Sequence, residues 1–251
     1  MESLGTVDKA IDVLFHLHEE AVPCGVSAIG RSLGMPKSSV HRLLSALTRR
    51  GMVERDDRGL YRPGIGLVAL GLGALEREPS VIAARPVLER FAEEIGETFF
   101  LVGARAGALI VLEKAEGTGV LRVAPRVGER VPIHATAVGK LYLALAPDVL
   151  GDLGTAPLPN YTPSTLTDRE VLEREVAAVR VAGFARNRDE WVPGLTVLAA
   201  PVWLGDRVAA AVAIALATSS LGTRSTSELE ARVRAAAAAI GARMNGTAPG
   251  S

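Results

Sequence analysis

The chain has 251 residues, of which 48% are hydrophobic and 4% aromatic, and its 28 basic and 28 acidic residues cancel. This length allows one large domain or two smaller ones with a substantial core, and so few aromatic residues disfavour stacking platforms for single-stranded nucleic acid. The single cysteine, Cys24, excludes an internal disulfide and a zinc site built from several thiolates. The first residues lack the pattern of a signal peptide and the apolar run 208–217 is too short to span a bilayer, so we expect a cytoplasmic protein without a membrane partner.

Hydrophobic periodicity predicts three helices and a hairpin in residues 1–63. Apolar residues follow helical spacing over 6–20 and over 36–50, and a short helix fits 26–33 with Ser27 as its N-cap. Gly34 suits the end of that short helix, and Pro36 suits the first turn of the next one. Two short strand-like runs then surround a DDRG turn, so the segment reads as a helix-turn-helix followed by a hairpin.

The polar side of the predicted helix 36–50 contains no acidic residue. A solvated helix face is the plain alternative, but such a face usually mixes both signs of charge. Over residues 25–62 the basic residues exceed the acidic ones by eight to three, which is a local signal for a nucleic acid. Because the start of a helix favours a phosphate, we expect Lys37 and Ser38 to contact a DNA backbone while mid-helix side chains read bases.

The remainder of the chain predicts an α+β fold. Residues 64–79 form an apolar linker helix, residues 80–245 alternate helices with strands, and residues 246–251 form a flexible tail. Within 80–245 we expect helices at 81–97, 135–147, 169–183 and 225–245. Strand pairs are expected at 98–117, 120–133 and 195–217.

Enzyme motifs are weak in this sequence. GRSLG at 30–34 fits the G-x-S-x-G pattern of a hydrolase nucleophile, but no strand precedes Ser32, as that motif requires. GIGLVA at 64–69 is followed by helices and not by a second strand, so we reject a dinucleotide site. The four histidines show no metal-binding spacing. We therefore expect no cofactor, no metal and no enzyme, and keep a hydrolase using Ser32 as the alternative.

In the stretch 131–146, small residues precede and begin a predicted helix. Free N–H groups at such a helix start offer a seat for a carboxylate or another anion. Close packing of the helix on a strand also favours Ala and Gly, and residues alone favour that structural explanation.

Taken together, these stretches resemble the IclR-type transcriptional regulators over nearly the whole chain. The resemblance rests on residues 34–64, 84–98, 127–144, 166–185 and 194–202. It implies an N-terminal winged helix-turn-helix, a linker helix, and a GAF-like mixed α/β effector domain that binds a small organic acid. It also implies homodimers through the N-terminal region, often paired into tetramers as dimers of dimers.

The resemblance and the residue patterns give two sets of candidate residues. The candidates for contacting a double-stranded DNA operator are Ser27, Lys37, Ser38, Ser39, His41, Arg42, Ser45, Arg49, Arg55, Arg58 and Arg62. The candidates for binding an effector are Ala135, Thr136, Ala137, Val138, Arg188, Asp189, Trp191, Leu195, Val197, Ala213 and Ala215.

Two departures from the family pattern bear on the effector. Ala213 and Ala215 stand where the family often carries hydroxyls, and Arg186, Arg188 and Trp191 stand where acidic and small residues are more usual. Losing two hydroxyls removes two hydrogen-bond partners for a polar ligand. We therefore expect an apolar pocket for an aromatic or acyl acid, with an arginine taking the anion.

Overall fold

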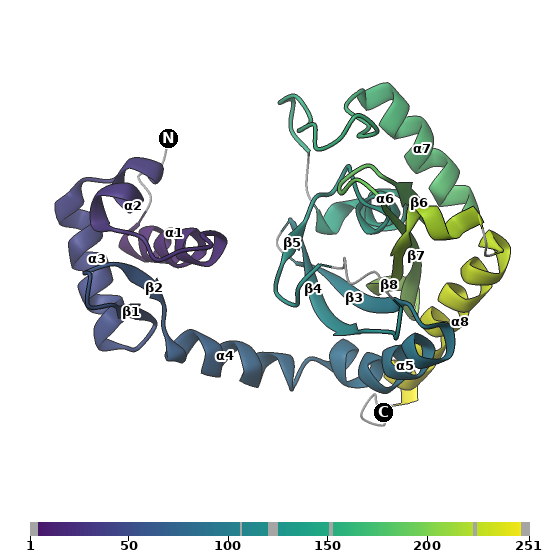
Figure 1. The fold of residues 1–251 in the computed structure, drawn as a ribbon, viewed down its shortest axis with the longest axis horizontal. Helices are drawn as coiled ribbons and strands as arrows, with labels where there is room; N and C mark the ends of the chain where they lie inside the picture. Colours follow the sequence, from purple (N-terminus) through teal and green to yellow (C-terminus); the bar gives the residue numbers. More distant parts are fainter. Residues whose placement is uncertain (1–4, 106, 120–124, 151–152, 223–224, 247–251) are drawn as a thin grey trace. The chain divides into compact units, whose positions relative to one another are not determined.

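A computed structural model describes residues 5–105, 107–119, 125–150, 153–222 and 225–246 of the chain (Figure 1). The chain divides into two compact units, Met1–Glu76 and Arg77–Ser251. Each unit has its own hydrophobic core and is described by itself.

The N-terminal unit is a helix-turn-helix with a small antiparallel hairpin. Its elements are α1 (Thr6–Glu19), α2 (Val26–Ser32), α3 (Lys37–Arg49), β1 (Val53–Arg55), β2 (Tyr61–Pro63) and α4 (Ile65–Leu75). One core joins α1, α2, α3 and the hairpin, and it includes Val13, Ile29, Val40, Leu44 and Tyr61. The apolar periodicity of the sequence predicted these helices because each one has a single buried side.

Local signals placed the ends of the first helices well, with one exception. Gly34 has a φ of 61°, which permits the turn between α2 and α3, and Pro36 is the N-cap of α3. The prediction that Ser27 is an N-cap is wrong, because Gly25 has that position and Ser27 lies inside the first turn of α2.

The C-terminal unit is built on a six-stranded antiparallel sheet. Its strands lie in the order β5-β4-β3-β8-β7-β6. Their bounds are β3 (Thr98–Arg105), β4 (Ala108–Ala115), β5 (Arg130–Val131), β6 (Ala185–Arg188), β7 (Leu195–Leu204) and β8 (Arg207–Ala217). Strand β3 pairs with β8, which is remote in sequence, so the two hairpins β3–β4 and β7–β8 become one sheet.

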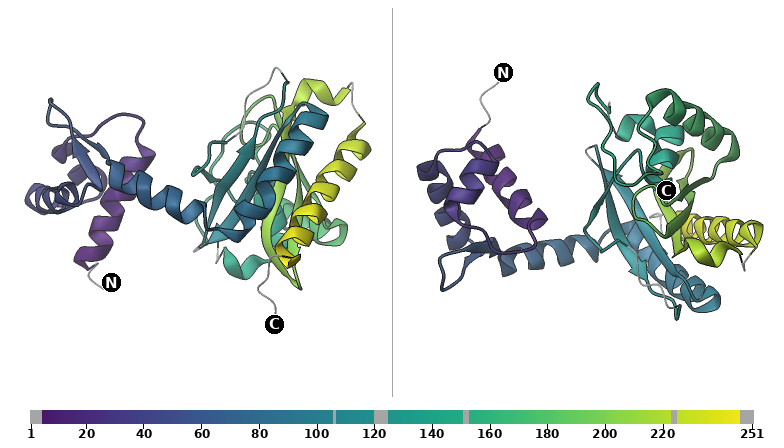
Figure 2. Two further views of the ribbon diagram at one scale, coloured as in Figure 1. Left: turned by 90° about the horizontal axis from the view of Figure 1, so that it is seen from below. Right: turned by 45° about the horizontal axis from the view of Figure 1, so that its top comes forward.

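Helices cover both faces of this sheet. Helices α5 (Pro79–Ile95) and α8 (Thr226–Gly246) lie side by side on one face, as Figure 2 shows. Helix α6 (Ala137–Leu145) packs on the other face against β6, β7 and β8, with α7 (Arg169–Ala182) outside it. Two short 3-10 turns, η1 (Pro147–Val149) and η2 (Thr218–Gly222), complete the elements.

The sheet differs from the sequence prediction at two places. Strand β6 was not predicted, because its sequence ARNR carries two arginines and lacks a run of β-branched residues. Of the predicted strand pair 120–133, residues 120–124 lie outside the described part, and only Arg130 and Val131 form a strand. In the described residues, no helix combines the length and hydropathy needed to cross a membrane.

Candidate functional site

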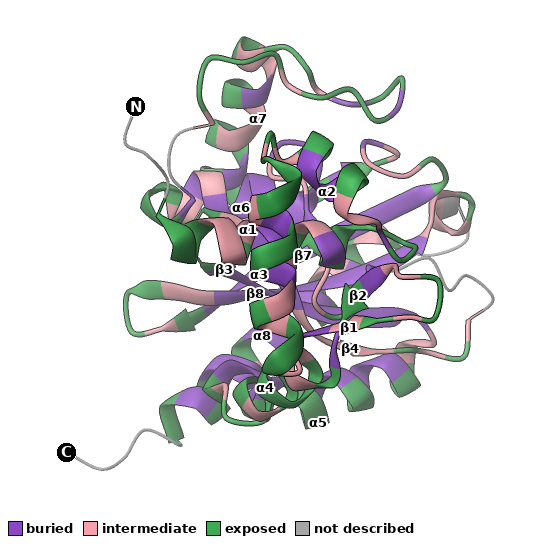
Figure 3. Ribbon diagram, turned by 90° about the vertical axis from the view of Figure 1, so that its left-hand side faces the viewer, coloured by how far each residue is buried: buried purple, intermediate pink, exposed green. Residues whose placement is uncertain are grey.

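Helix α3 presents a polar, acid-free surface on an anchored base. Val40, Leu43 and Leu44 are buried in the N-terminal core and fix the helix. The opposite side is exposed (Figure 3), and among the predicted contact residues it carries Lys37, Ser38, His41, Arg42 and Arg49. The predicted division of this helix into a buried and an exposed side is therefore confirmed.

Two predicted contact residues of α3 are less available. Ser39 is only half-exposed. Ser45 is also half-exposed, and its hydroxyl donates a hydrogen bond of 2.8 Å to the carbonyl oxygen of His41. A hydroxyl bonded to its own helix has less capacity for an outside partner. Lys37, Ser38, His41, Arg42 and Arg49 are therefore the predicted contact residues of α3 that are fully exposed.

The hairpin that follows α3 has a tight, rigid tip. One carboxylate oxygen of Asp56 accepts hydrogen bonds from the backbone N–H groups of Arg58 and Leu60, at 3.0 and 2.8 Å. Arg58 is exposed at this tip, whereas Arg62 donates to the Glu54 carboxylate at 3.1 Å. The guanidinium of Arg55 lies over the Tyr61 ring at 5.7 Å. Of the three predicted arginines, Arg58 is thus the one that is exposed at the tip of the hairpin.

Ser32 does not belong to a catalytic triad. Its Oγ lies 3.5 Å from His16 Nδ1, and the Glu20 carboxylate lies 4.0 Å from the same nitrogen. A triad needs the serine on one ring nitrogen and the acid on the other, because the histidine relays between them. Ser32 also ends helix α2 without a preceding strand. The described residues contain no group of three metal-ligating side chains either.

A small cavity lies inside the C-terminal unit, between α6 and the sheet. Its volume is about 20 Å³. The described residues that line it are Phe100, Pro125, Val131, Thr136, Val138, Asn187, Trp191, Leu195 and Val197. A cavity of this volume holds no more than a water molecule, so an organic ligand requires it to widen.

The start of α6 is held close to the segment before it. The Thr136 hydroxyl donates to the Pro132 carbonyl at 2.6 Å and accepts from the Gly139 N–H at 3.0 Å, so it caps the helix. A Cβ on Gly139 would collide with the backbone of Ile133, so only glycine permits this approach. Small residues in this stretch therefore allow α6 to pack closely on the segment before it, and Thr136 and Val138 also line the cavity.

Asn187 is a cavity residue that the sequence did not reveal. Its amide nitrogen donates to the Ala135 carbonyl at 2.8 Å, and its amide oxygen accepts from the Val197 N–H at 3.2 Å. The side chain is buried and ties the start of α6 to strands β6 and β7.

We expect Asn187→Ala to lower the free energy of unfolding by about 1–3 kcal/mol, because two buried polar groups lose their partner. Urea unfolding of the full chain measures this loss. Asn160→Ala, at an exposed position, is the control and should leave the midpoint unchanged. Equal urea midpoints for both variants would show that the Asn187 amide does not stabilise the fold.

Arg188, which was expected to take an anion in the pocket, does not line the cavity. Along β6 the residues alternate between buried and exposed, and Asn187 points into the core while its two neighbours do not. The Arg188 side chain is 70% exposed, and its Nε lies 3.8 Å from the Asp189 carboxylate. Asp189 has a φ of 59°, and its carboxylate accepts from Gly194 N–H and the Thr218 hydroxyl, both at 2.8 Å, so it fastens a turn and does not line the cavity.

The other predicted effector residues divide into two groups. Thr136, Val138, Trp191, Leu195 and Val197 line the cavity. Ala135, Ala137, Ala213 and Ala215 are buried in the same unit without lining the cavity.

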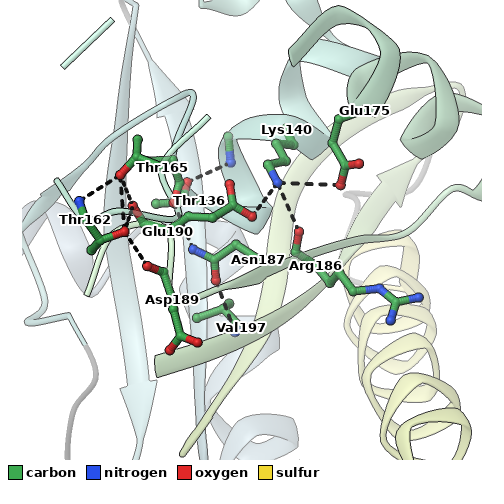
Figure 4. A network of polar contacts seen from close by, with 12 residues as sticks. Thr136, Lys140, Thr162, Thr165, Glu175, Arg186, Asn187, Asp189, Glu190 and Val197 are labelled. Atoms are coloured by element: carbon green, nitrogen blue, oxygen red, sulfur yellow. Dashed lines mark hydrogen bonds and ion pairs between the residues drawn. The ribbon is translucent and has the colours of Figure 1, made fainter. Parts of the chain in front are cut away.

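A buried ion pair lies next to the cavity wall (Figure 4). Lys140 Nζ donates to Glu190 Oε1 at 2.7 Å, and it lies 3.5 Å from the Glu175 carboxylate and 3.4 Å from the Arg186 carbonyl. Glu190 directly precedes Trp191, and burial raises its pKa even though Lys140 opposes that rise. Neither Lys140 nor Glu190 was among the residues predicted to bind an effector.

Two threonines hold the segment that carries Glu190. The Thr165 hydroxyl donates to the Glu190 carbonyl at 2.6 Å, and the Thr162 hydroxyl donates to the Asp189 carbonyl at 2.6 Å. The connection between β6 and β7 is thus fastened from the side of the loop before α7.

Comparisons with known proteins agree with this architecture. A family model described as "IclR helix-turn-helix domain" matches residues 6–57, and one described as "Bacterial transcriptional regulator IclR C-terminal" matches residues 73–242. The regulator XynR of Escherichia coli K12, described as an HTH-type transcriptional regulator, is 31% identical over 85% of this chain and 86% of its own length.

Solved structures show the same fold. An IclR transcriptional regulator from Silicibacter sp. TM1040 superposes with a TM-score of 0.85 at 30% identity, over 98% of each chain. An IclR homologue from Microbacterium hydrocarbonoxydans, complexed with 4-hydroxybenzoate, has a TM-score of 0.81 at 26% identity, over 97% of this chain and 100% of its own.

Proposed function

Since this chain belongs to the IclR family of bacterial transcriptional regulators, we propose that a small aromatic or acyl acid, bound in the C-terminal unit, modulates its binding to an operator. Family membership makes it a DNA-binding regulator and not an enzyme. The ligand, the contact residues and the assembly described below are proposals.

The observation that carries the DNA interface is the acid-free exposed side of α3. In a winged helix-turn-helix, such a helix enters the major groove, where arginine and histidine side chains reach base edges. Lys37 at the helix start and Arg58 at the hairpin tip are exposed and positively charged, which suits backbone phosphates. We assign base reading to His41 and Arg42 and phosphate contacts to Lys37, Arg49 and Arg58.

Two apolar stripes of the N-terminal unit support a dimer. Val7, Ile11 and Phe15 follow one another at four-residue spacing on α1, and all three are exposed. Ile65, Val68 and Leu72 are exposed at helical spacing on α4, a helix without a single buried residue. Exposed apolar stripes of this kind mark protein contacts. We propose a second copy of this chain as the partner, because two symmetric helix-turn-helix units read two half-sites of one operator.

The cavity beside α6 is the proposed effector site. Its described lining is mainly apolar, with the Thr136 hydroxyl and the Asn187 amide as polar groups, which fits an aromatic or acyl body with few polar atoms. A relative with this fold is complexed with 4-hydroxybenzoate, and for this chain we propose the same chemical class. The acid changes operator binding only as far as it binds the DNA-competent and incompetent arrangements differently.

A larger side chain at Val138 tests the effector site directly. Val138 is buried and lines the cavity, so Val138→Phe should fill the space into which the cavity widens. We expect the acid response to disappear while operator binding without acid stays within about two-fold, and stability to fall by roughly 1–3 kcal/mol from overpacking. Fluorescence anisotropy of labelled operator, titrated with protein with and without acid, measures both.

Val181→Phe is the matched control, because Val181 is 92% exposed on α7. The control should respond to acid like the wild type. A full acid response in Val138→Phe would place the effector elsewhere.

A further inference from the structure

The proposed effector is an anion, yet the described residues that line the cavity carry no charge. A buried carboxylate needs a charged or strongly hydrogen-bonding partner, because losing its water shell is costly. Among the described residues, Lys140 is the only buried lysine or arginine, with 1% of its surface exposed. Its ammonium donates to the Glu190 carboxylate and to the Arg186 carbonyl. Trp191, which follows Glu190, and Asn187, which follows Arg186, both line the cavity. The buried cation beside these wall residues is therefore already paired with a carboxylate.

The resident carboxylate is incompletely satisfied. Glu190 Oε1 accepts from Lys140 at 2.7 Å, and the backbone N–H of Arg188 also lowers the pKa of this carboxyl, whereas the buried Glu190 Oε2 makes no hydrogen bond of good geometry. An unpaired buried oxygen is costly, and desolvation raises the pKa of this carboxyl for the same reason. The bond from Lys140 thus holds the Glu190 carboxylate in a surrounding that disfavours its charge. If another carboxylate took the place of Glu190 on Lys140, Glu190 would move to water readily.

Glu190 also lies on the connection between β6 and β7, which carries part of the cavity wall. Trp191, the next residue, forms part of the cavity wall, and Pro193 and Gly194 further along the same connection are exposed. This connection is fastened by the Glu190–Lys140 bond, by the Thr162 and Thr165 hydroxyls, and by the hydrogen bonds that the Asp189 carboxylate accepts. Releasing Glu190 would remove the ion pair from this set and leave Trp191 less firmly held.

We propose that Lys140 binds the carboxylate of the effector and that this carboxylate displaces Glu190 from the ammonium. The proposal rests on the acid effector proposed above and names the residue that selects it. One carboxylate exchanges for another, so the buried ammonium stays neutralised, and Glu190 moves outward to water with both oxygens solvated. The withdrawal of Glu190 and Trp191 widens the cavity and changes the connection between β6 and β7.

The decisive variant is Glu190→Gln, which keeps the size of the side chain and removes the competing charge. Lys140 retains Glu175 as a counter-ion at 3.5 Å, so the fold has a neutralised ammonium in this variant. We expect carboxylates to bind the variant roughly ten-fold more tightly than the wild type, since a charge-assisted bond no longer has to be broken. Isothermal titration calorimetry with 4-hydroxybenzoate, benzoate and hexanoate, each beside its amide, measures the change; the amides should bind both proteins alike.

Glu175→Gln is the matched control. It also removes a carboxylate from Lys140, but the Lys140–Glu175 distance is longer, at 3.5 Å, and the Glu175 side chain is 39% exposed. We expect less than about a three-fold gain, because water screens that charge. Equal gains in both variants would indicate a general charge effect and overturn the displacement.

A second readout follows the displaced segment. The chain has two tryptophans, so Trp203→Phe leaves Trp191 as the sole tryptophan, whose emission can be excited apart from that of tyrosine. Acid binding should shift Trp191 emission in the Trp203→Phe protein, and Glu190→Gln should produce part of that shift without ligand.

If acids bind the wild type and Glu190→Gln with equal affinity, Lys140 is not the receptor, although the acid effector stands. If no acid or amide of the panel binds either protein, the acid effector and this inference both fail.

Discussion

Replacing Arg42 with alanine is expected to remove most of the preference for the operator over unrelated DNA. Arg42 is exposed on α3, one residue before Leu43, which is buried in the N-terminal core. A side chain so anchored has a defined reach, and a bidentate contact from arginine to a guanine contributes about 1–3 kcal/mol of discrimination. Operator affinity should therefore fall by roughly ten-fold to a hundred-fold, while affinity for random DNA changes little. Anisotropy titrations on both duplexes at one salt concentration measure the two affinities.

Arg58→Ala is the matched comparison. Arg58 is exposed at the hairpin tip, where Asp56 holds the turn through backbone bonds. A phosphate contact has no sequence preference, so this variant should weaken binding to operator and random DNA by similar factors and flatten the salt dependence. Equal losses on both duplexes for Arg42→Ala as well would contradict the assignment of Arg42 to base reading.

The second large effect concerns the proposed dimer. Leu72→Asp introduces a charge into the apolar stripe of α4, where Leu72 is 56% exposed. The charge costs little in an isolated chain but several kcal/mol when a second copy covers it, because it then loses its water without a partner. We expect the protein to become monomeric and operator affinity to drop by about a hundred-fold or more, since one half-site binds alone. Analytical ultracentrifugation and anisotropy give the two results.

Leu70→Asp provides the control on the same helix. Leu70 is 60% exposed but lies off the stripe formed by Ile65, Val68 and Leu72. It should leave the assembly intact. Should Leu72→Asp remain dimeric with unchanged operator affinity, the partner copy would have to bind through another surface.

The N-terminal unit was predictable from the sequence because its signals are local. Buried residues at helical spacing, the Gly34 turn and the DDRG turn each act within a few residues. Ser27 shows the limit of such signals. A serine near a helix start is an expected N-cap, but here the chain enters the helix two residues earlier, at Gly25.

The proposed effector site was less predictable because it joins residues that are distant in sequence. The motif around Thr136 marked one wall, and Leu195 and Val197 marked another. Asn187 and Lys140 escaped notice because a polar residue in a charged or helical stretch is usually solvated. Only the pairing of β6 with β7 shows that Asn187 faces the core and that Arg188 does not. The Lys140–Glu190 pair likewise depends on the contact of α6 with the segment after β6.

The most direct test of a ligand-responsive regulator is the ratio of two affinities. A duplex enriched from random sequence by the full chain is compared with a scrambled duplex of the same composition, by anisotropy, with and without aromatic and acyl acids. We predict that the enriched duplex binds about a thousand-fold more tightly or better, with an affinity that falls steeply with salt. At least one acid should shift that affinity. Equal affinities for both duplexes, or an operator affinity that no acid changes, would contradict the account.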